Sequence, residues 1–103
     1  MIYISGPMSD IKHYNHPEFN RVAAALRAVG HKVFNPAEIV VDTSGMNKKE
    51  IWQAYMDICI PAVEKCNAIY LLVGWEKSPG AKRELKRAIE LDFDIILQSK
   101  NIG

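Results

Sequence analysis

Short apolar runs alternate with longer amphipathic segments along the chain. Four runs have the composition of β-strands: residues 1–5, 31–34, 68–73 and 94–97. Three segments between them carry apolar residues at helical spacing: one that begins at Pro17 and stops at Gly30, one over residues 47–66, and one over residues 81–91. The order βαβαβαβ predicts one α/β domain, residues 1–103, with an open parallel sheet of about four to five strands and helices on both faces.

Ligands of such sheets bind beyond the carboxyl ends of the strands. In this chain the segments that follow strands at that rim are residues 5–8, 35–36 and 74–80. We therefore expect the functional site there.

The last predicted helix carries a carboxylate on its apolar side. At 100° per residue, Glu84 falls between Ala88 and Leu91 on the apolar arc, while the basic residues occupy the opposite arc. A charge in that position must be paired, hydrogen-bonded or next to a cavity, because burying it bare is costly. Either Glu84 bends outward and pairs with Lys77 or Arg87, or it is a nucleophile or base at the bottom of a pocket.

The loop before that helix combines Ser78, Pro79 and Gly80. Serine is a favoured N-cap residue, proline suits the first helical position, and glycine lets a ligand approach the backbone. The free N–H groups of such a terminus suit an anion. Simple helix capping uses the same groups, so both interpretations stay open.

Composition and charge narrow the classes of function. With 103 residues and a net charge of +1, the chain gives no sign of a surface for a nucleic-acid polymer. No apolar run approaches the roughly 20 residues of a membrane span, and the first eight residues are too short for a signal peptide. Cys59 and Cys66 lie seven apart without histidines at ligand spacing. We expect a cytoplasmic protein with two buried thiols and no metal site.

The segment over residues 47–66 is apolar on more than one side, and only a narrow polar stripe is left. A helix of this kind usually packs on two sides, so it predicts a homodimer or a higher homo-oligomer. Pro61 is expected to kink or divide the helix. Asp57 lies in the polar stripe, for which a solvated face is the simpler interpretation.

Two familiar nucleotide signatures are absent. The chain reads SGPMSD after its first strand, which matches neither a dinucleotide-binding nor a phosphate-loop motif, so no cofactor is expected. Trp75 could stack on a base or cover the core. Tyr3 is expected to face the core, unless the end of its strand brings the hydroxyl to the rim.

Three stretches together carry a family resemblance: YISGPM, NHPEFNRVAAALRAVGHKVFNPAEI and YMDICIPAVEKCNAIYLLVGWEKSPGAKRELKRAIELD. They span nearly the whole chain and resemble the nucleoside 2-deoxyribosyltransferase-like superfamily, in particular its small DUF4406-type domains. The resemblance implies a flavodoxin-like sheet and cleavage of the bond between a deoxyribose and its base.

The resemblance also implies roles for individual residues. Ser78, Gly80 and Glu84 match the SxGxxxE pattern, whose glutamate is the nucleophile, and Asp57 matches an aspartate that assists proton transfer and orientation. Glu84 would attack the anomeric carbon and form a glycosyl ester with retention. The residues expected to contact the nucleoside or nucleotide are Tyr3, Gly6, Pro7, Met8, Ser9, Trp75, Ser78 and Gly80.

Two positions depart from better-characterised relatives. The turn after the first strand has no arginine for a phosphate, and Glu76 stands where transferases often have a further aspartate. The interpretation is therefore an N-glycosidase or deoxyribosyltransferase, without a choice of base, phosphorylation state or acceptor. The alternatives are a catalytically inactive nucleotide- or metabolite-binding module and a purely structural partner.

Overall fold

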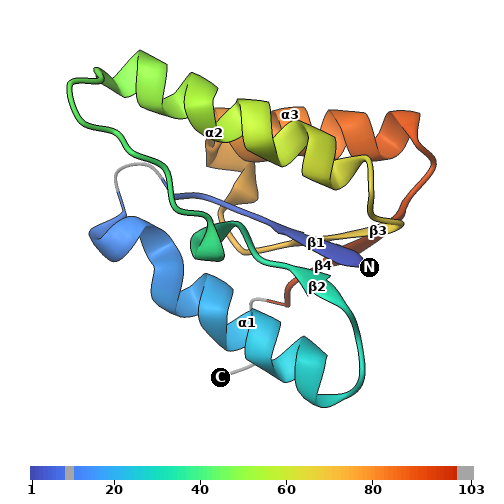
Figure 1. Cartoon of the computed structure of the whole chain (residues 1–103). Coiled ribbons are helices and arrows are strands. Elements are labelled where there is room, and N and C mark those ends of the chain that lie inside the picture. The colour runs from blue at the N-terminus through green and yellow to red at the C-terminus, as the bar shows by residue number, and fades with distance from the viewer. Residues whose placement is uncertain (9–10, 100–103) are drawn as a thin grey trace.

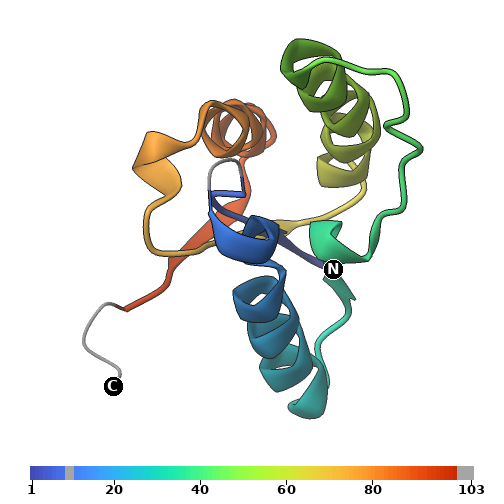
Figure 2. The same cartoon turned by 90° about the vertical axis from the view of Figure 1, so that its left-hand side faces the viewer.

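The computed structural model describes residues 1–8 and 11–99. Its strands are β1 (Ile2–Ser5), β2 (Val33–Phe34), β3 (Ala68–Leu71) and β4 (Asp94–Leu97), and its α-helices are α1 (His16–Ala28), α2 (Lys48–Val63) and α3 (Pro79–Glu90). The four strands form one parallel sheet in the order β2-β1-β3-β4. The predicted α/β fold of flavodoxin-like arrangement is confirmed, with α2 and α3 on one face and α1 on the other (Figure 1, Figure 2).

The helices begin where local chemistry favours a start. Asn47 caps α2 and forms a capping box with Glu50, and Ser78 caps α3 with Pro79 at the first helical position. Pro61 does not divide α2, which continues to Val63, so that part of the prediction is wrong. Pro61 forgoes the one hydrogen bond that a backbone N–H would donate to the carbonyl four residues earlier, but the helix ends soon after it, at Val63.

The predicted strands are correct in place, and all except 94–97 are longer than the observed ones. The run 68–73 pairs as a strand only to Leu71, although Leu72 stays fully buried and donates its N–H to Ser5 O at 2.8 Å. The run 31–34 is reduced to two residues that pair with β1. The apolar runs thus show which residues are buried, and the buried residues extend beyond the last residue that pairs as a strand.

Alternation along β1 divides the core in two. Tyr3 packs with Cys59 and Val63 of α2 and with Ala88 of α3, whereas Ile4 packs with residues of α1. Because helices cover both faces of the sheet and β1 lies between β2 and β3, all four residues of β1 are buried (Figure 1). The carboxyl end of this central strand points at the start of α3. Within the described residues, no helix combines the length and apolar character that a bilayer-spanning helix requires.

Candidate functional site

Glu84 is buried, with only 5% of its surface exposed. It lies in α3 on the same side as Ala81 and Ala88, which contact the sheet, as the helical pattern predicted. In the part of the chain that the structure describes, no basic side chain forms an ion pair with it. Arg87 instead pairs with Glu64 and Glu90 on the outer surface. The outward-facing interpretation of Glu84 is therefore excluded.

Two hydroxyl groups of β1 hold the Glu84 carboxylate. Tyr3 donates its hydroxyl to Oε2 at 2.5 Å, and Ser5 donates its hydroxyl to Oε1 at 2.7 Å. Both donors are buried, and they lie on the same face of β1 because side chains two apart share a face. Each carboxylate oxygen thus has one fixed donor, which orients the group and satisfies it in the absence of a cation.

Burial controls the electrostatics of this cluster. It raises the pKa of Glu84 to about 7, and the hydrogen bonds from Tyr3 and Ser5 act in the opposite direction by favouring the charged form. Burial, followed by the nearby Glu84 charge, raises the pKa of Cys59 to about 12 and that of Tyr3 well above its usual value. At neutral pH the cluster therefore holds a neutral phenol, a neutral thiol and a carboxyl that is about half ionised.

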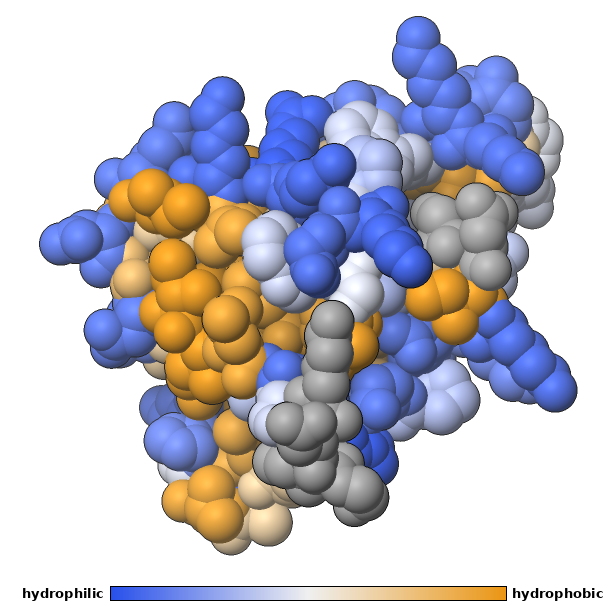
Figure 3. Space-filling view, turned by 180° about the vertical axis from the view of Figure 1, so that it is seen from behind, coloured by the Kyte–Doolittle hydropathy of each residue, from blue (hydrophilic) through white to orange (hydrophobic). Residues whose placement is uncertain are grey.

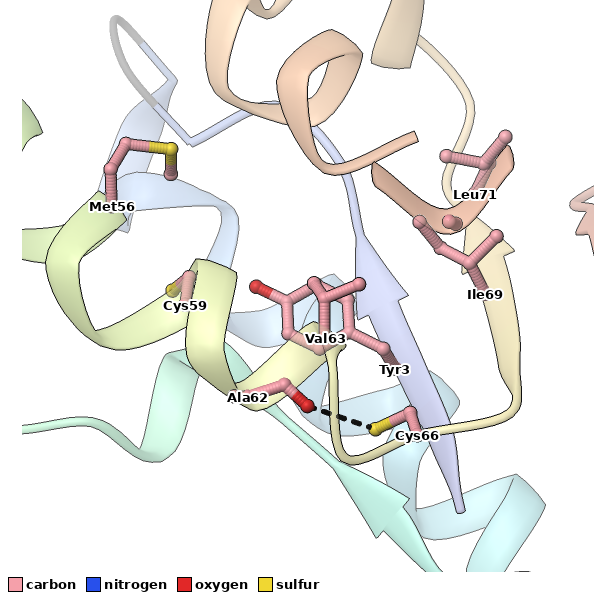
Figure 4. Packing of buried hydrophobic residues seen from close by; sticks show 9 residues of the cluster. Tyr3, Met56, Cys59, Ala62, Val63, Cys66, Ile69 and Leu71 are labelled. Carbon is pink, nitrogen blue, oxygen red and sulfur yellow. Dashed lines mark hydrogen bonds between the residues drawn. The ribbon is translucent and has the colours of Figure 1, made fainter. Parts of the chain in front are cut away.

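The Tyr3 hydroxyl points toward the Cys59 sulfur from across the core (Figure 4). Tyr3 itself is fixed by its neighbours, since its ring stacks on Phe34 with 5.4 Å between centroids and 9° between planes. Such a constrained ring leaves the hydroxyl little freedom, so the position of Glu84 depends on the packing of β1.

The start of α3 packs closely against α2. The Ser78 hydroxyl accepts a hydrogen bond from Ala81 N at 3.1 Å, so the predicted N-cap is confirmed. A Cβ on Gly80 would lie 3.2 Å from Met56 Cε and 3.4 Å from Trp52 Nε1. Gly80 therefore lets α2 pack closely against the first turn of α3. This packing role was not predicted, since the sequence suggested only that Gly80 lets a ligand approach the backbone.

The turn after β1 is fixed by tight packing. A Cβ on Gly6 would lie 2.7 Å from Leu72 Cβ, so only glycine fits there. Pro7 accepts a hydrogen bond from Asn15 Nδ2 at 3.0 Å, and Met8 packs against the core on the α1 side. Met8 thus lies on the opposite side of the sheet from Glu84. The predicted contact at Ser9 falls outside the described residues.

In the described part of the chain, neither Trp75 nor Asp57 is a hydrogen-bond partner of the Glu84 carboxylate. Trp75 is half-buried and packs against the edge of the core between sheet and α2–α3. Asp57 is exposed and accepts a hydrogen bond from Gln53 Nε2 at 2.7 Å on the outer side of α2. The structure therefore brings Tyr3 and Glu84 together and does not bring Asp57 to them, in agreement with its place in the polar stripe.

Two shallow hollows lie elsewhere on the described surface, and Glu84 lines neither of them. One, of about 250 Å³, lies on the outside of α2 and α3 around Arg83 and Lys86, and the other, of about 210 Å³, lies beside Trp75 and Leu97. Among the described residues, no group of three or more His, Cys, Asp or Glu side chains is arranged to hold a metal ion. The Glu84 cluster is therefore a candidate site because of its buried, hydrogen-bonded carboxylate, and not because it lines either hollow.

Comparison with known families gives one match, over residues 1–97, to a domain of unknown function (DUF4406). The chain belongs to this family. No curated protein matches the chain. Membership of the DUF4406 family confirms the narrower part of the resemblance and assigns no activity.

Two residues of the DUF4406 domain were missed as members of the cluster. Ser5 follows Tyr3 by two positions at the end of a predicted strand, so alternation could have placed its hydroxyl beside that of Tyr3. Cys59 gave no such signal, because a thiol on a broadly apolar helix resembles any other core residue. Its contact with Tyr3 depends on how α2 crosses the sheet, which no local pattern specifies.

Proposed function

We propose that this protein cleaves or transfers the N-glycosidic bond of (deoxy)nucleosides or their monophosphates, with Glu84 as nucleophile. The observation that supports this is a buried carboxylate at the carboxyl end of the central parallel strand, held by two hydroxyls and not paired with any cationic side chain of the described residues. The resemblance to the nucleoside 2-deoxyribosyltransferase-like superfamily supplies the bond and the substrate class.

The proposed reaction has two displacement steps. An oxygen of ionised Glu84 attacks the anomeric carbon, the bond from that carbon to the base nitrogen breaks, and its electron pair leaves with the base, which takes up a proton. Water or a second base then attacks the same carbon and releases the Glu84 carboxylate, with overall retention. Each oxygen of Glu84 has a second lone pair that Tyr3 and Ser5 do not occupy, so attack does not require either hydrogen bond to break.

Tyr3 and Ser5 are positioning residues in this proposal. Their hydrogen bonds favour the ionised form of Glu84 against burial, which is the form that attacks. A pKa of about 7 makes the ionised fraction rise through neutral pH, so the rate of base release is expected to rise over the same range. The family resemblance implies that Asp57 assists proton transfer, and the proposal keeps this role as a separate step that can be tested.

The experiment follows free base released from deoxynucleosides and their monophosphates. Glu84→Gln is expected to abolish release, whereas Glu90→Gln, on the exposed side of the same helix, is expected to retain it. Asp57→Asn tests the second carboxylate separately. Loss of base release in this variant indicates that Asp57 supplies the proton to the departing base, and full activity indicates that water supplies it. Release that survives Glu84→Gln contradicts the mechanism.

A second candidate is a nucleotide- or metabolite-binding domain without chemistry. It is favoured by the low exposure of Glu84 and by the hydrogen bond that each of its oxygens already has within the protein. Thermal-shift measurements with the same compounds decide between the candidates. Stabilisation by a nucleotide, without base release at high protein concentration, supports binding alone.

A further inference from the structure

The β4 strand is the least covered part of the sheet. It lies at the edge of the order β2-β1-β3-β4, and all four of its residues are exposed although three of them are aliphatic. Ile95 is 46% exposed, Ile96 38% and Leu97 63%. Edge strands of soluble proteins are usually shortened, charged or covered, because an open apolar edge pairs with other strands.

Two further side chains extend this surface. Ile89, 59% exposed, lies in the last turn of α3. Arg83 and Arg87 contact Trp52 and Glu64 of α2, and helical periodicity places Ile89 on the side of α3 that faces away from α2. Val73, 42% exposed, lies next to the end of β4, since its N–H donates to the Gln98 side chain.

We call these five residues the β4 surface: Val73, Ile89, Ile95, Ile96 and Leu97. Seen from the β4 side, a broad apolar area covers this part of the molecule (Figure 3). These five residues together expose roughly 450 Å² per copy, and Ile96 points to the opposite face of the β4 edge from Ile95 and Leu97. Complete coverage of two such surfaces would bury roughly 900 Å² in all, backbone atoms of these residues included, which is at the small end of specific interfaces.

We propose that the β4 surface is the interface between two copies of this chain, whose β4 strands pair antiparallel across a two-fold axis and continue the sheet. The backbone of β4 is suited to this arrangement. Asp94 N and Gln98 N bond to carbonyls of the β3 side, so the intervening Ile95 and Leu97 direct their N–H and C=O groups to the open edge.

One register uses all of these groups. It places Ile95 of one copy opposite Leu97 of the other, and the two Ile96 residues opposite each other at the two-fold axis. This pairing gives about four backbone hydrogen bonds across the axis. The same register places Asp94 opposite Gln98 and so avoids two opposed carboxylates. Gln98 uses Oε1 to accept from Val73 N, and its Nε2 amide remains a donor for Asp94 of the other copy.

This assignment differs from the interface predicted on residues 47–66. Most of the apolar side chains there are accounted for within the chain, because α2 packs against both the sheet and α3. Of the large apolar side chains that the structure describes in α2, only Ile58 is exposed, at 40%. The breadth of its apolar surface reflects two intramolecular neighbours, so the β4 surface is the better candidate for contact between copies.

Mass measurement by light scattering at micromolar concentration tests the proposal on the full chain. The wild type is expected at twice 11.6 kDa. Ile95→Lys places a charge on the exposed edge and is expected to give the monomer, whereas Val40→Lys, at a position 95% exposed outside the surface, is expected to stay dimeric. A monomeric wild type, or a dimer that Ile95→Lys leaves intact, overturns the proposal.

A cross-link tests the register itself. Opposed Ile96 residues form a non-hydrogen-bonded pair with Cα atoms about 4.5 Å apart, which lies within the range that a disulfide spans. Ile96→Cys is therefore expected to give a disulfide-linked dimer on mild oxidation, and Val40→Cys is expected to give none. The native Cys59 and Cys66 are buried and do not compete. A dimeric Ile96→Cys protein that fails to cross-link overturns the antiparallel pairing.

Discussion

Replacing Glu84 by Gln keeps the size of the side chain and removes its titration. The carboxyl has a pKa of about 7 in the folded protein and 4.5 as its ordinary value, so the folded state holds the proton more tightly than the unfolded state. Its contribution to stability is therefore fully present below pH 4.5 and is lost as pH rises through about 7. Between those values the unfolded chain has released this proton and the folded chain has kept it.

The size of the loss follows from the difference between the two pKa values. At about 1.4 kcal/mol for each pH unit, this difference corresponds to a loss on the order of 3 kcal/mol. For a domain of this length, that is a shift of roughly 10–20 °C in Tm. The Glu84→Gln protein lacks this loss, so its free energy of unfolding relative to wild type should rise by about this amount from acid to mildly alkaline pH.

Urea denaturation of both proteins at several pH values between 4 and 8.5 measures the effect. Glu90→Gln is the matched control, since Glu90 lies at the exposed end of the same helix and pairs with Arg87 at 3.5 Å on the surface. Comparing each variant with wild type at the same pH cancels the titration of all other groups. A stability difference for Glu84→Gln that stays constant over this range would falsify the reasoning, because Glu84 would then titrate as an exposed carboxyl.

Two further predictions concern the neighbours of Glu84. Tyr3→Phe removes a hydrogen bond that lowers the pKa of Glu84, so the pH at which stability stops falling should move to more alkaline values in the same denaturation series. Gly6→Ala should lower the free energy of unfolding by about 1–3 kcal/mol, because its Cβ would meet the Cβ of Leu72, which cannot move without the backbone. Gly80→Ala should cost less, since its Cβ meets the flexible end of Met56 and alanine favours the helix; equal losses in thermal melts would contradict this comparison.

Local patterns predicted the parts of this protein that depend on local geometry. The position of Glu84 on the apolar side of its helix followed from helical periodicity, which left its direction open, and the capping role of Ser78 followed from its position before Pro79. The parallel sheet followed from the alternation of apolar runs and amphipathic helices. In each case a few neighbouring residues carry the whole signal.

Other parts depend on how distant elements meet. Asp57 illustrates the difference: the polar stripe predicted an exposed side chain, which the structure bears out, while its catalytic role came from resemblance alone and stays a prediction. The apolar breadth of α2 could not distinguish two neighbours within the chain from one neighbour outside it. The two hydroxyls on Glu84 and the thiol of Cys59 likewise became neighbours only through the crossing of α2 and α3 over β1.

The hydrogen bonds on Glu84 join positions 81 and 79 residues apart in the chain. Contacts with such a large sequence separation require the closure of a long loop. The Tyr3 and Ser5 hydroxyls therefore lack the Glu84 acceptor in any state in which α3 is not docked on the sheet. A local opening that detaches α3 from the sheet breaks both hydrogen bonds to Glu84 and exposes the core beneath α3 at the same time. The two hydrogen bonds are therefore intact only while α3 is docked on the sheet.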